Sequence, residues 1–134
     1  MNLILLSSDL VTQSKVAGAA QALGLTSVVA SNIRRLMEAT EESAIVVLDL
    51  ATQGYDPIDV VGQLKGLPFA PKAILAFGPH VHEARLQSAV DAGCDAVFPR
   101  GQFFGQTEDI LRQYLGSNPK YEARNPKQIR STND

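Results

Sequence analysis

The sequence predicts an α/β domain built on a parallel sheet, and three observations support this fold class. Short apolar runs bounded by turn residues recur along the chain, as expected of strands that are covered on both faces. Segments with apolar residues at helical spacing separate these runs, which is the alternation typical of βαβ units. The length of 134 residues suits one domain with a single continuous core.

Five runs are expected to form the strands. They are Leu3–Leu6, Ser27–Ala30, Ala44–Leu48, Ala73–Phe77 and Ala96–Phe98. The second run is the least apolar of the five. The first run lacks a basic leader and is too short for a signal-peptide core or a membrane span, so we interpret it as a buried strand.

Five helices are expected between and after these strands, and most of them carry a start or a stop signal. They are Leu10–Leu23, a segment that follows Ser31 or Asn32, a segment that begins at Asp56-Pro57, Val81–Ala92, and a segment between Thr107 and Gly116. Asp9 or Ser8 is the expected cap of the first helix. Gly93 is the expected left-handed residue after the fourth.

Composition narrows the class of protein. Hydrophobic residues make up 45% and charged residues 19%, which indicates a folded globular chain, and the formal charge of -2 gives no overall attraction to nucleic acid or to an anionic membrane. The single cysteine, Cys94, excludes an internal disulfide and favours a cytoplasmic location. We expect one domain over residues 1–116 and a polar, flexible tail over residues 117–134.

The residues that follow the strands are the candidates for a functional site, because ligands of open parallel sheets gather at the carboxyl ends of the strands. Asp49 follows the third strand and is the centre of this set. The other candidates, taken strand by strand, are Ser7, Ser8, Asp9, Phe77, Gly78 and Arg100.

Two strings in this order resemble the receiver domain of response regulators, a CheY-like, flavodoxin-like family. The string Val46-Val47-Leu48-Asp49-Leu50 is similar to the strand that carries the phospho-accepting aspartate, and Ala92-Gly93-Cys94-Asp95-Ala96-Val97 is similar to the stretch that leads into the last strand. The resemblance spans about Leu3 to Leu115. It implies a three-layer αβα sandwich with a five-stranded parallel sheet in the order 2-1-3-4-5, and Asp49 as the equivalent of the phosphoacceptor.

The resemblance also shows departures from the working parts of a receiver. Ser7 and Ser8 stand where the family has its magnesium-binding acidic pair, and hydroxyls bring no charge to a hard cation. Asp9 could replace one acid, although we favour its interpretation as the helix cap. Phe77 and Gly78 stand where the family has a hydroxyl that senses the phosphoryl group. Arg100 stands where receivers have a lysine after the fifth strand, and it could pair with Asp49 directly.

The sequence therefore predicts a stand-alone pseudo-receiver, a signalling module with no catalytic residues and no cofactor. Its partner would be a protein, with a histidine kinase, a separate effector and a second copy of the chain as the candidates. No membrane contact is expected, and nucleic acid is disfavoured. The surface of the fourth helix, fifth strand and fifth helix would dock the partner, with Phe103, Phe104 and Tyr114 beside it. The alternative interpretation of the two rings is that both cover the fifth helix.

Two other functions stay open. The first is a functional response regulator that is phosphorylated on Asp49 by a histidine kinase, with Asp9 holding Mg²⁺. The second is a flavodoxin-like binder of a nucleotide or flavin, which fits less well because Ser7-Ser8-Asp9 contains no glycine and places an anion where phosphate should bind. His80 and His82 could share a metal, but no third ligand is evident nearby in the sequence, so we expect no metal site there.

Overall fold

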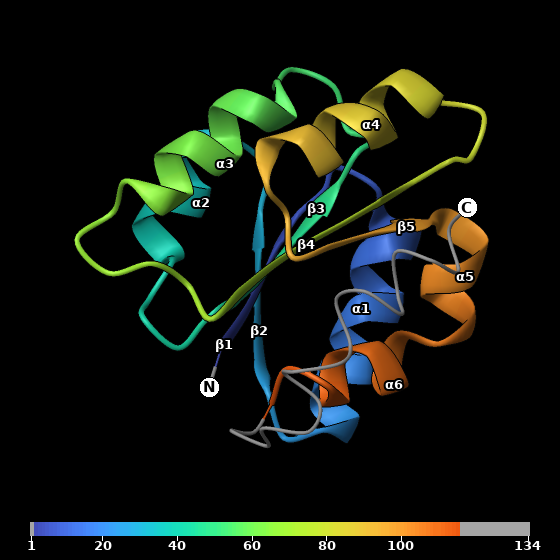
Figure 1. Cartoon of the computed structure of the whole chain (residues 1–134). Coiled ribbons are helices and arrows are strands. Elements are labelled where there is room, and N and C mark those ends of the chain that lie inside the picture. Colours follow the sequence, from blue (N-terminus) through green and yellow to red (C-terminus); the bar gives the residue numbers. More distant parts are fainter. Residues whose placement is uncertain (1, 116–134) are drawn as a thin grey trace.

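The computed structural model describes residues 2–115, which form a parallel sheet covered by helices on both faces (Figure 1). The strands are β1 (Asn2–Leu6), β2 (Thr26–Ala30), β3 (Ile45–Asp49), β4 (Ala73–Gly78) and β5 (Ala96–Pro99). Their order in the sheet is β2-β1-β3-β4-β5, and all four neighbouring pairs are parallel. The predicted fold class and strand order are confirmed.

Six helices complete the described part of the chain. They are α1 (Leu10–Ala22), α2 (Ile33–Ala39), α3 (Pro57–Lys65), α4 (Glu83–Ala92), α5 (Arg100–Gly105) and α6 (Thr107–Arg112). Figure 1 shows α2, α3 and α4 on one face of the sheet and α1, α5 and α6 on the other. The result is the three-layer sandwich that the sequence predicted.

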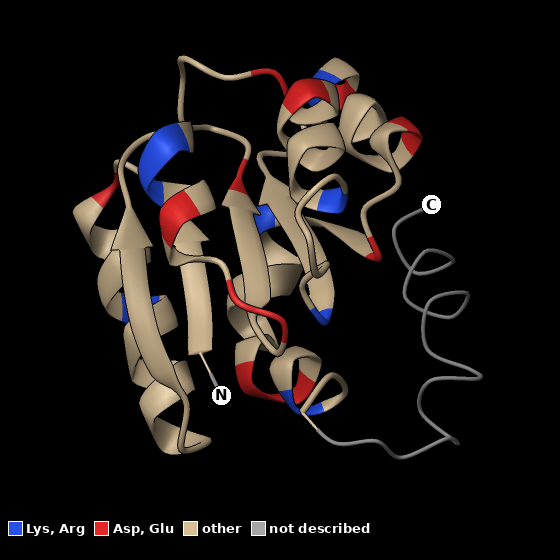
Figure 2. Cartoon of the chain, turned by 90° about the vertical axis from the view of Figure 1, so that its left-hand side faces the viewer, with Lys and Arg blue, Asp and Glu red and all other residues tan. Residues whose placement is uncertain are grey.

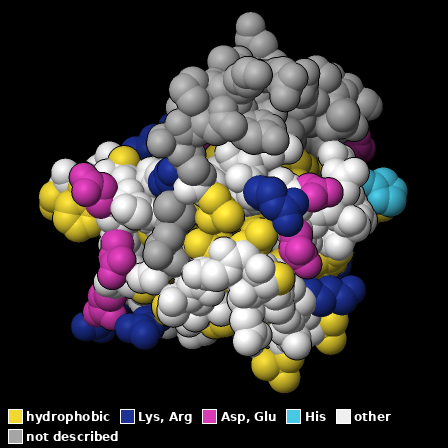
Figure 3. Space-filling view, turned by 90° about the horizontal axis from the view of Figure 1, so that it is seen from below, with side chains coloured by type: hydrophobic (Ala, Val, Ile, Leu, Met, Phe, Trp, Pro, Cys, Tyr) yellow, Lys and Arg dark blue, Asp and Glu magenta, His cyan; other side chains and the backbone are white. Residues whose placement is uncertain are grey.

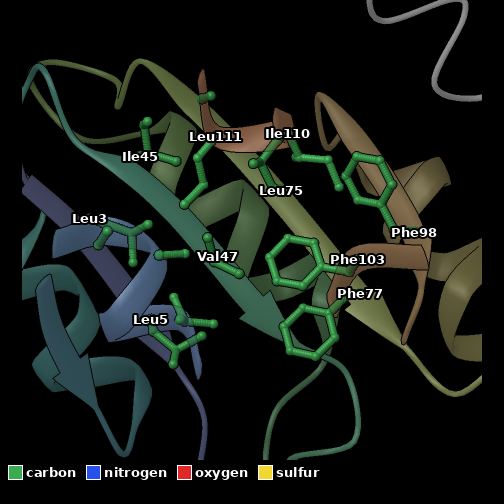
Figure 4. Packing of buried hydrophobic residues seen from close by; sticks show 14 of the residues in the cluster. Leu3, Leu5, Ile45, Val47, Leu75, Phe77, Phe98, Phe103, Ile110 and Leu111 are labelled. Carbon is green, nitrogen blue, oxygen red and sulfur yellow. The ribbon is translucent and has the colours of Figure 1, made fainter. Parts of the chain in front are cut away.

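The core is divided by the sheet into two hydrophobic clusters, because successive side chains of a strand point to opposite faces. Figure 4 shows the cluster on the α1 side, to which β3 contributes Ile45 and Val47. Val46 and Leu48 belong to the cluster on the other side. This alternation places the side chain of Asp49, the last residue of β3, on the α1 side of the sheet.

Charged residues are concentrated outside the sheet, on the helices and connecting segments (Figure 2). Asp49 is the only charged residue within the five strands of the described chain. A single carboxylate at the carboxyl edge of an apolar sheet needs local hydrogen-bond donors, and these donors define the candidate site.

The helix boundaries follow the local signals of the sequence. The side chain of Asp9 accepts a hydrogen bond from the Thr12 amide and caps α1, and the side chains of Asn32 and Asp56 cap α2 and α3 in the same way. Gly93 ends α4 with a left-handed φ of 97°. The interpretation of Asp9 as a helix cap is confirmed.

Three expectations about the helices and their surface were wrong. No helix was expected from Arg100 to Gly105, where the chain forms α5, and α4 begins at Glu83 rather than at Val81. Phe103 was expected at a docking surface but is fully buried, because α5 turns its ring onto β4 and β5.

Large hydrophobic side chains do reach the surface, and Figure 3 shows some of them beside charged groups. Those that are most exposed in residues 2–115 are Leu10, Val11, Ile58 and Val81. Within the same residues, no helix is long and apolar enough to cross a membrane. The predicted tail at 117–134 lies outside the residues that the structure describes.

Candidate functional site

Asp49 is buried at the carboxyl edge of the sheet, with 1% of its surface exposed. Its Oδ2 accepts a hydrogen bond from the Ser7 hydroxyl at 2.7 Å, and its Oδ1 accepts one from the Ala51 amide at 3.0 Å. Both carboxylate oxygens are therefore engaged by neutral donors of the protein. A buried carboxylate is tolerated when hydrogen bonds replace its lost hydration in this way.

Ser7 and Ser8, which follow β1, use their polar groups within the protein. The buried Ser7 hydroxyl also accepts a hydrogen bond from the Asp9 amide at 3.1 Å, and the Ser8 amide donates to the Thr52 hydroxyl at 3.0 Å. The amides that lead into α1 are thus already satisfied. A phosphate-binding loop would need such amides free, so this geometry gives no support to a nucleotide or flavin site.

Asp9 lies at the start of α1 and directs its carboxylate toward the helix. Its Oδ2 accepts hydrogen bonds from the Thr12 amide at 3.0 Å and from the Thr12 hydroxyl at 2.6 Å. These bonds, of which that from the hydroxyl is the larger cause, hold the pKa of Asp9 below its usual value, with a smaller contribution from the Arg100 guanidinium. The Asp9 carboxylate is therefore committed to capping.

Arg100 contacts Asp9 rather than Asp49. Its Nη2 lies 3.5 Å from Asp9 Oδ2, and its guanidinium lies 5.2 Å from the centre of the Phe104 ring. The expected ion pair between Arg100 and Asp49 is not the contact that the structure shows. The first turn of α5 carries Arg100 toward the start of α1, where the exposed carboxylate of Asp9 is available and the buried one of Asp49 is not.

Phe77 takes the position beside Asp49 on the neighbouring strand. The two residues are partners in the register of β3 and β4, so their side chains project from the same face of the sheet. The Phe77 ring stacks on Phe103 with the ring centres 4.5 Å apart and the planes 3° apart (Figure 4). The stacked rings of Phe77 and Phe103 therefore occupy the position at which the resemblance to receivers implies a hydroxyl.

Gly78, the next residue of β4, is confined by Leu50. A Cβ atom at Gly78 would lie 2.9 Å from Leu50 Cβ, which is closer than such atoms approach in proteins. Leu50 is itself buried, with 1% exposed, and its amide bonds the Phe77 carbonyl at 2.8 Å. A serine or threonine at position 78 would therefore require the backbone after Asp49 to shift.

Two residues that the sequence did not single out complete the surroundings of Asp49. The Tyr55 hydroxyl donates to the Asp49 main-chain carbonyl at 2.8 Å, and burial raises the pKa of this hydroxyl above its usual range, so it remains a donor. Arg85 of α4 donates to main-chain carbonyls of the segment between β3 and α3. Polar residues with main-chain partners leave no pattern in a sequence, and no signal could have identified them.

The side chains around Asp49 do not suit a divalent cation. Magnesium prefers carboxylate oxygens and water, whereas the nearest side-chain group to Asp49 is the Ser7 hydroxyl and the Asp9 carboxylate is bonded to Thr12 and Arg100. In the part of the chain that the structure describes, no group of three or more His, Cys, Asp and Glu residues could hold a metal ion.

The parallel sheet in the order 2-1-3-4-5 is the arrangement of strands that similar solved structures share. No family model matches the sequence, and no curated protein matches it. A response regulator from Thermotoga maritima is similar in structure, with a TM-score of 0.69 and 13% identity over 87% of this chain and 98% of that one.

Two further structures have the same fold. The signal receiver domain of a response regulator from Bermanella marisrubri gives a TM-score of 0.71 with 22% identity over 86% of this chain and 98% of that one. The receiver domain of a sensor histidine kinase from Pseudomonas aeruginosa, which has a magnesium ion coordinated in its active site cleft, gives 0.69 with 14% identity over 87% and 98%. The chain thus has the CheY-like receiver fold.

Proposed function

We propose that the chain is a pseudo-receiver, a signalling module that binds a protein partner without normal magnesium-dependent phosphorylation of Asp49. The observation that carries this proposal is that both oxygens of the Asp49 carboxylate accept hydrogen bonds from within the protein. One oxygen is bonded to the Ser7 hydroxyl and the other to the Ala51 amide, and the whole residue is 1% exposed. Phosphoryl transfer to a carboxylate needs an exposed oxygen and a cation to neutralise the developing charge.

The apolar surroundings support the same proposal. Phe77 lies beside Asp49 and is stacked on Phe103, and Leu50 closes the space next to Gly78. Neither position offers a hydroxyl that could respond to a phosphoryl group. In this proposal Asp49 is a structural carboxylate that orders the carboxyl edge of the sheet, and the chain has no catalytic turnover of its own.

The partner is proposed to be a protein, either a histidine kinase or a separate effector. We place the docking surface on α4, β5 and α6, because α6 is the helix expected as the fifth in the sequence. Phe104 and Tyr114 beside it are partly exposed, while Phe103 is withdrawn from it. Cys94 is a buried thiol that is not part of a disulfide, which is consistent with the cytoplasm as the location we propose. The output of such a module would be contact with another molecule.

A titration followed by NMR tests this proposal. Mg²⁺ and beryllofluoride are added to the isotopically labelled chain, and the amide signals of Ser7, Asp49 and Ala51 are followed. We expect no saturable shift. Saturable shifts that disappear in Asp49→Asn and persist in the control Asp59→Asn, an exposed carboxylate on α3, would overturn the proposal.

The same titration distinguishes the second candidate, a functional response regulator phosphorylated on Asp49. Solved structures with this fold include a receiver domain activated by BeF3 and one with coordinated magnesium, so both reagents suit domains of this shape. In that case Asp9 would have to leave Thr12 and Arg100 in order to contact the ion. A response of the Thr12 amide to Mg²⁺ alone would be the signature of this change.

A further inference from the structure

A second polar network lies on the opposite side of the segment that follows Asp49, and its centre is Arg85. Arg85 belongs to α4, while its three hydrogen bonds reach the segment between β3 and α3, about thirty residues earlier in the chain. Its Nε donates to the Leu50 carbonyl at 2.6 Å, Nη2 to the Thr52 carbonyl at 3.3 Å, and Nη1 to the Tyr55 carbonyl at 3.2 Å. One guanidinium thus bonds three main-chain carbonyls of a single connecting segment.

Tyr55 connects this network to Asp49. The Arg85 guanidinium lies 5.0 Å from the centre of the Tyr55 ring, a cation–π geometry, and the Tyr55 hydroxyl donates to the Asp49 carbonyl at 2.8 Å. The continuous path therefore runs from α4 through Arg85 and Tyr55 to the residue that ends β3. A planar guanidinium with donors in a fixed fork suits this arrangement, whereas an ammonium group could not bond all three carbonyls with the same geometry.

The other hydrogen bonds of this segment run to Ser8 and to the carboxyl edge of the sheet, since the Ser8 amide donates to the Thr52 hydroxyl and the Tyr55 hydroxyl to the Asp49 carbonyl. The amides of Leu50 and Thr52 bond the carbonyls of Phe77 and Asp49, and the Ala51 amide bonds the Asp49 carboxylate. Gly54, with φ of 94°, lies in the open with no atom near its Cβ position. The three bonds from Arg85 join residues 50–55 to α4.

We propose that Arg85 is a conformational latch that holds α4 and the segment 50–55 in one fixed arrangement, so that α4 is presented to a partner without any chemical change at Asp49. This inference rests on the proposed function, because it concerns how the pseudo-receiver presents α4 to a protein partner. It explains how a receiver fold with a closed aspartate site presents a single docking surface. Because the Arg85 side chain connects α4 to residues 50–55, its removal is expected to loosen both segments together.

Amide hydrogen exchange on the full chain tests the latch without any partner or phosphodonor. The variants are Arg85→Gln, which removes the charge and the fork, and Arg85→Lys, which keeps only the charge. The control is Arg34→Gln, whose guanidinium is exposed on α2 and lies 3.7 Å from Glu38. The informative amides are those of Ala51 and Thr52 in the segment and that of Leu86 in α4, which bonds the His82 carbonyl.

We expect Arg85→Gln to raise exchange at these three amides by about tenfold or more, because each charged hydrogen bond that is lost favours the open segment. Arg85→Lys should give an intermediate increase. The Ile74 amide, which bonds the Asp95 carboxylate, should keep its rate, and Arg34→Gln should change none of them. Unchanged exchange in the segment, or an equal increase at Ile74, would overturn the latch.

If Arg85→Gln does not fold, Arg85→Lys provides the second test, since it keeps the charge and removes the fork that bonds the three carbonyls. Faster exchange at Ala51 and Thr52 in this variant would support the latch, and unchanged exchange would overturn it. Saturable shifts in the magnesium and beryllofluoride titration described above would overturn the proposed function without affecting this exchange result. Conversely, unchanged exchange would overturn the latch without affecting the proposed function, which is based on the hydrogen bonds of the Asp49 carboxylate.

Discussion

Replacement of Ser7 by alanine is the most informative test of the polar centre of the fold. The Ser7 hydroxyl is fully buried, donates to Asp49 Oδ2 at 2.7 Å and accepts from the Asp9 amide at 3.1 Å. Its removal leaves a buried carboxylate oxygen without its donor. Hydrogen bonds to charged groups contribute about 1.5–3 kcal/mol, so we expect Ser7→Ala to lower the free energy of unfolding by about 2–3 kcal/mol.

The expected change is large enough to measure by urea or thermal unfolding followed by circular dichroism. With an unfolding entropy of roughly 2.1 cal/mol/K per residue, a loss of about 2 kcal/mol lowers the melting temperature of a domain of this size by roughly 8 °C. The matched control is Ser8→Ala, because Ser8 is exposed and contributes its amide rather than its hydroxyl. Its effect should stay within about 0.5 kcal/mol.

A double-mutant cycle with Asp49→Asn locates the effect at the contact between the two side chains. If the hydroxyl acts through the Asp49 carboxylate, Ser7→Ala should cost much less in the Asp49→Asn background, with a coupling of about 1 kcal/mol or more. Equal costs for Ser7→Ala and Ser8→Ala, or additive effects in the cycle, would refute the reasoning that Ser7 satisfies this carboxylate.

Three further predictions concern the surroundings of the site. Gly78→Thr should destabilise the fold by about 1–3 kcal/mol through its contact with Leu50, and Leu50→Ala should restore part of the loss; a neutral Gly78→Thr in urea unfolding would contradict this. Phe103→Ala should cost about 3–5 kcal/mol and Phe104→Ala clearly less, because only the first ring is fully buried; equal losses in the same assay would argue against the assigned burial. Asp9→Ala should lower stability at neutral pH and lose this effect as the pH falls below 3.8. A carboxyl with a lowered pKa stabilises the fold above its unfolded pKa and no longer does so once it is protonated in the folded state. A difference from the unsubstituted chain that persists in unfolding curves at low pH would contradict this assignment.

The architecture could be predicted from the sequence because its causes are local. Apolar runs predict the strands, and the caps at Asp9 and Asp56 and the glycine at position 93 predict the helix ends. The strand order came from the resemblance to receivers, which adds information that periodicity lacks. Even α4 was misplaced only at its start, where Val81 extends an apolar pattern into a turn.

The contacts of the site were harder to predict because they depend on tertiary placement. Two adjacent phenylalanines suggest exposure, but the helical turn after Pro99 directs Phe103 into the core and leaves Phe104 near the surface. Arg100 was expected at Asp49, yet the same turn brings it to Asp9. The sequence also could not identify Arg85, because its three acceptors are main-chain carbonyls that any residue provides.

One claim about Asp49 can be checked by calorimetric titration of the chain with Mg²⁺. The claim is that the Asp49 carboxylate is satisfied by neutral donors of the protein and leaves no place for a cation. We expect no saturable heat at millimolar Mg²⁺ and the same trace for Asp49→Asn. Saturable binding of one ion per chain that is lost in Asp49→Asn would contradict it.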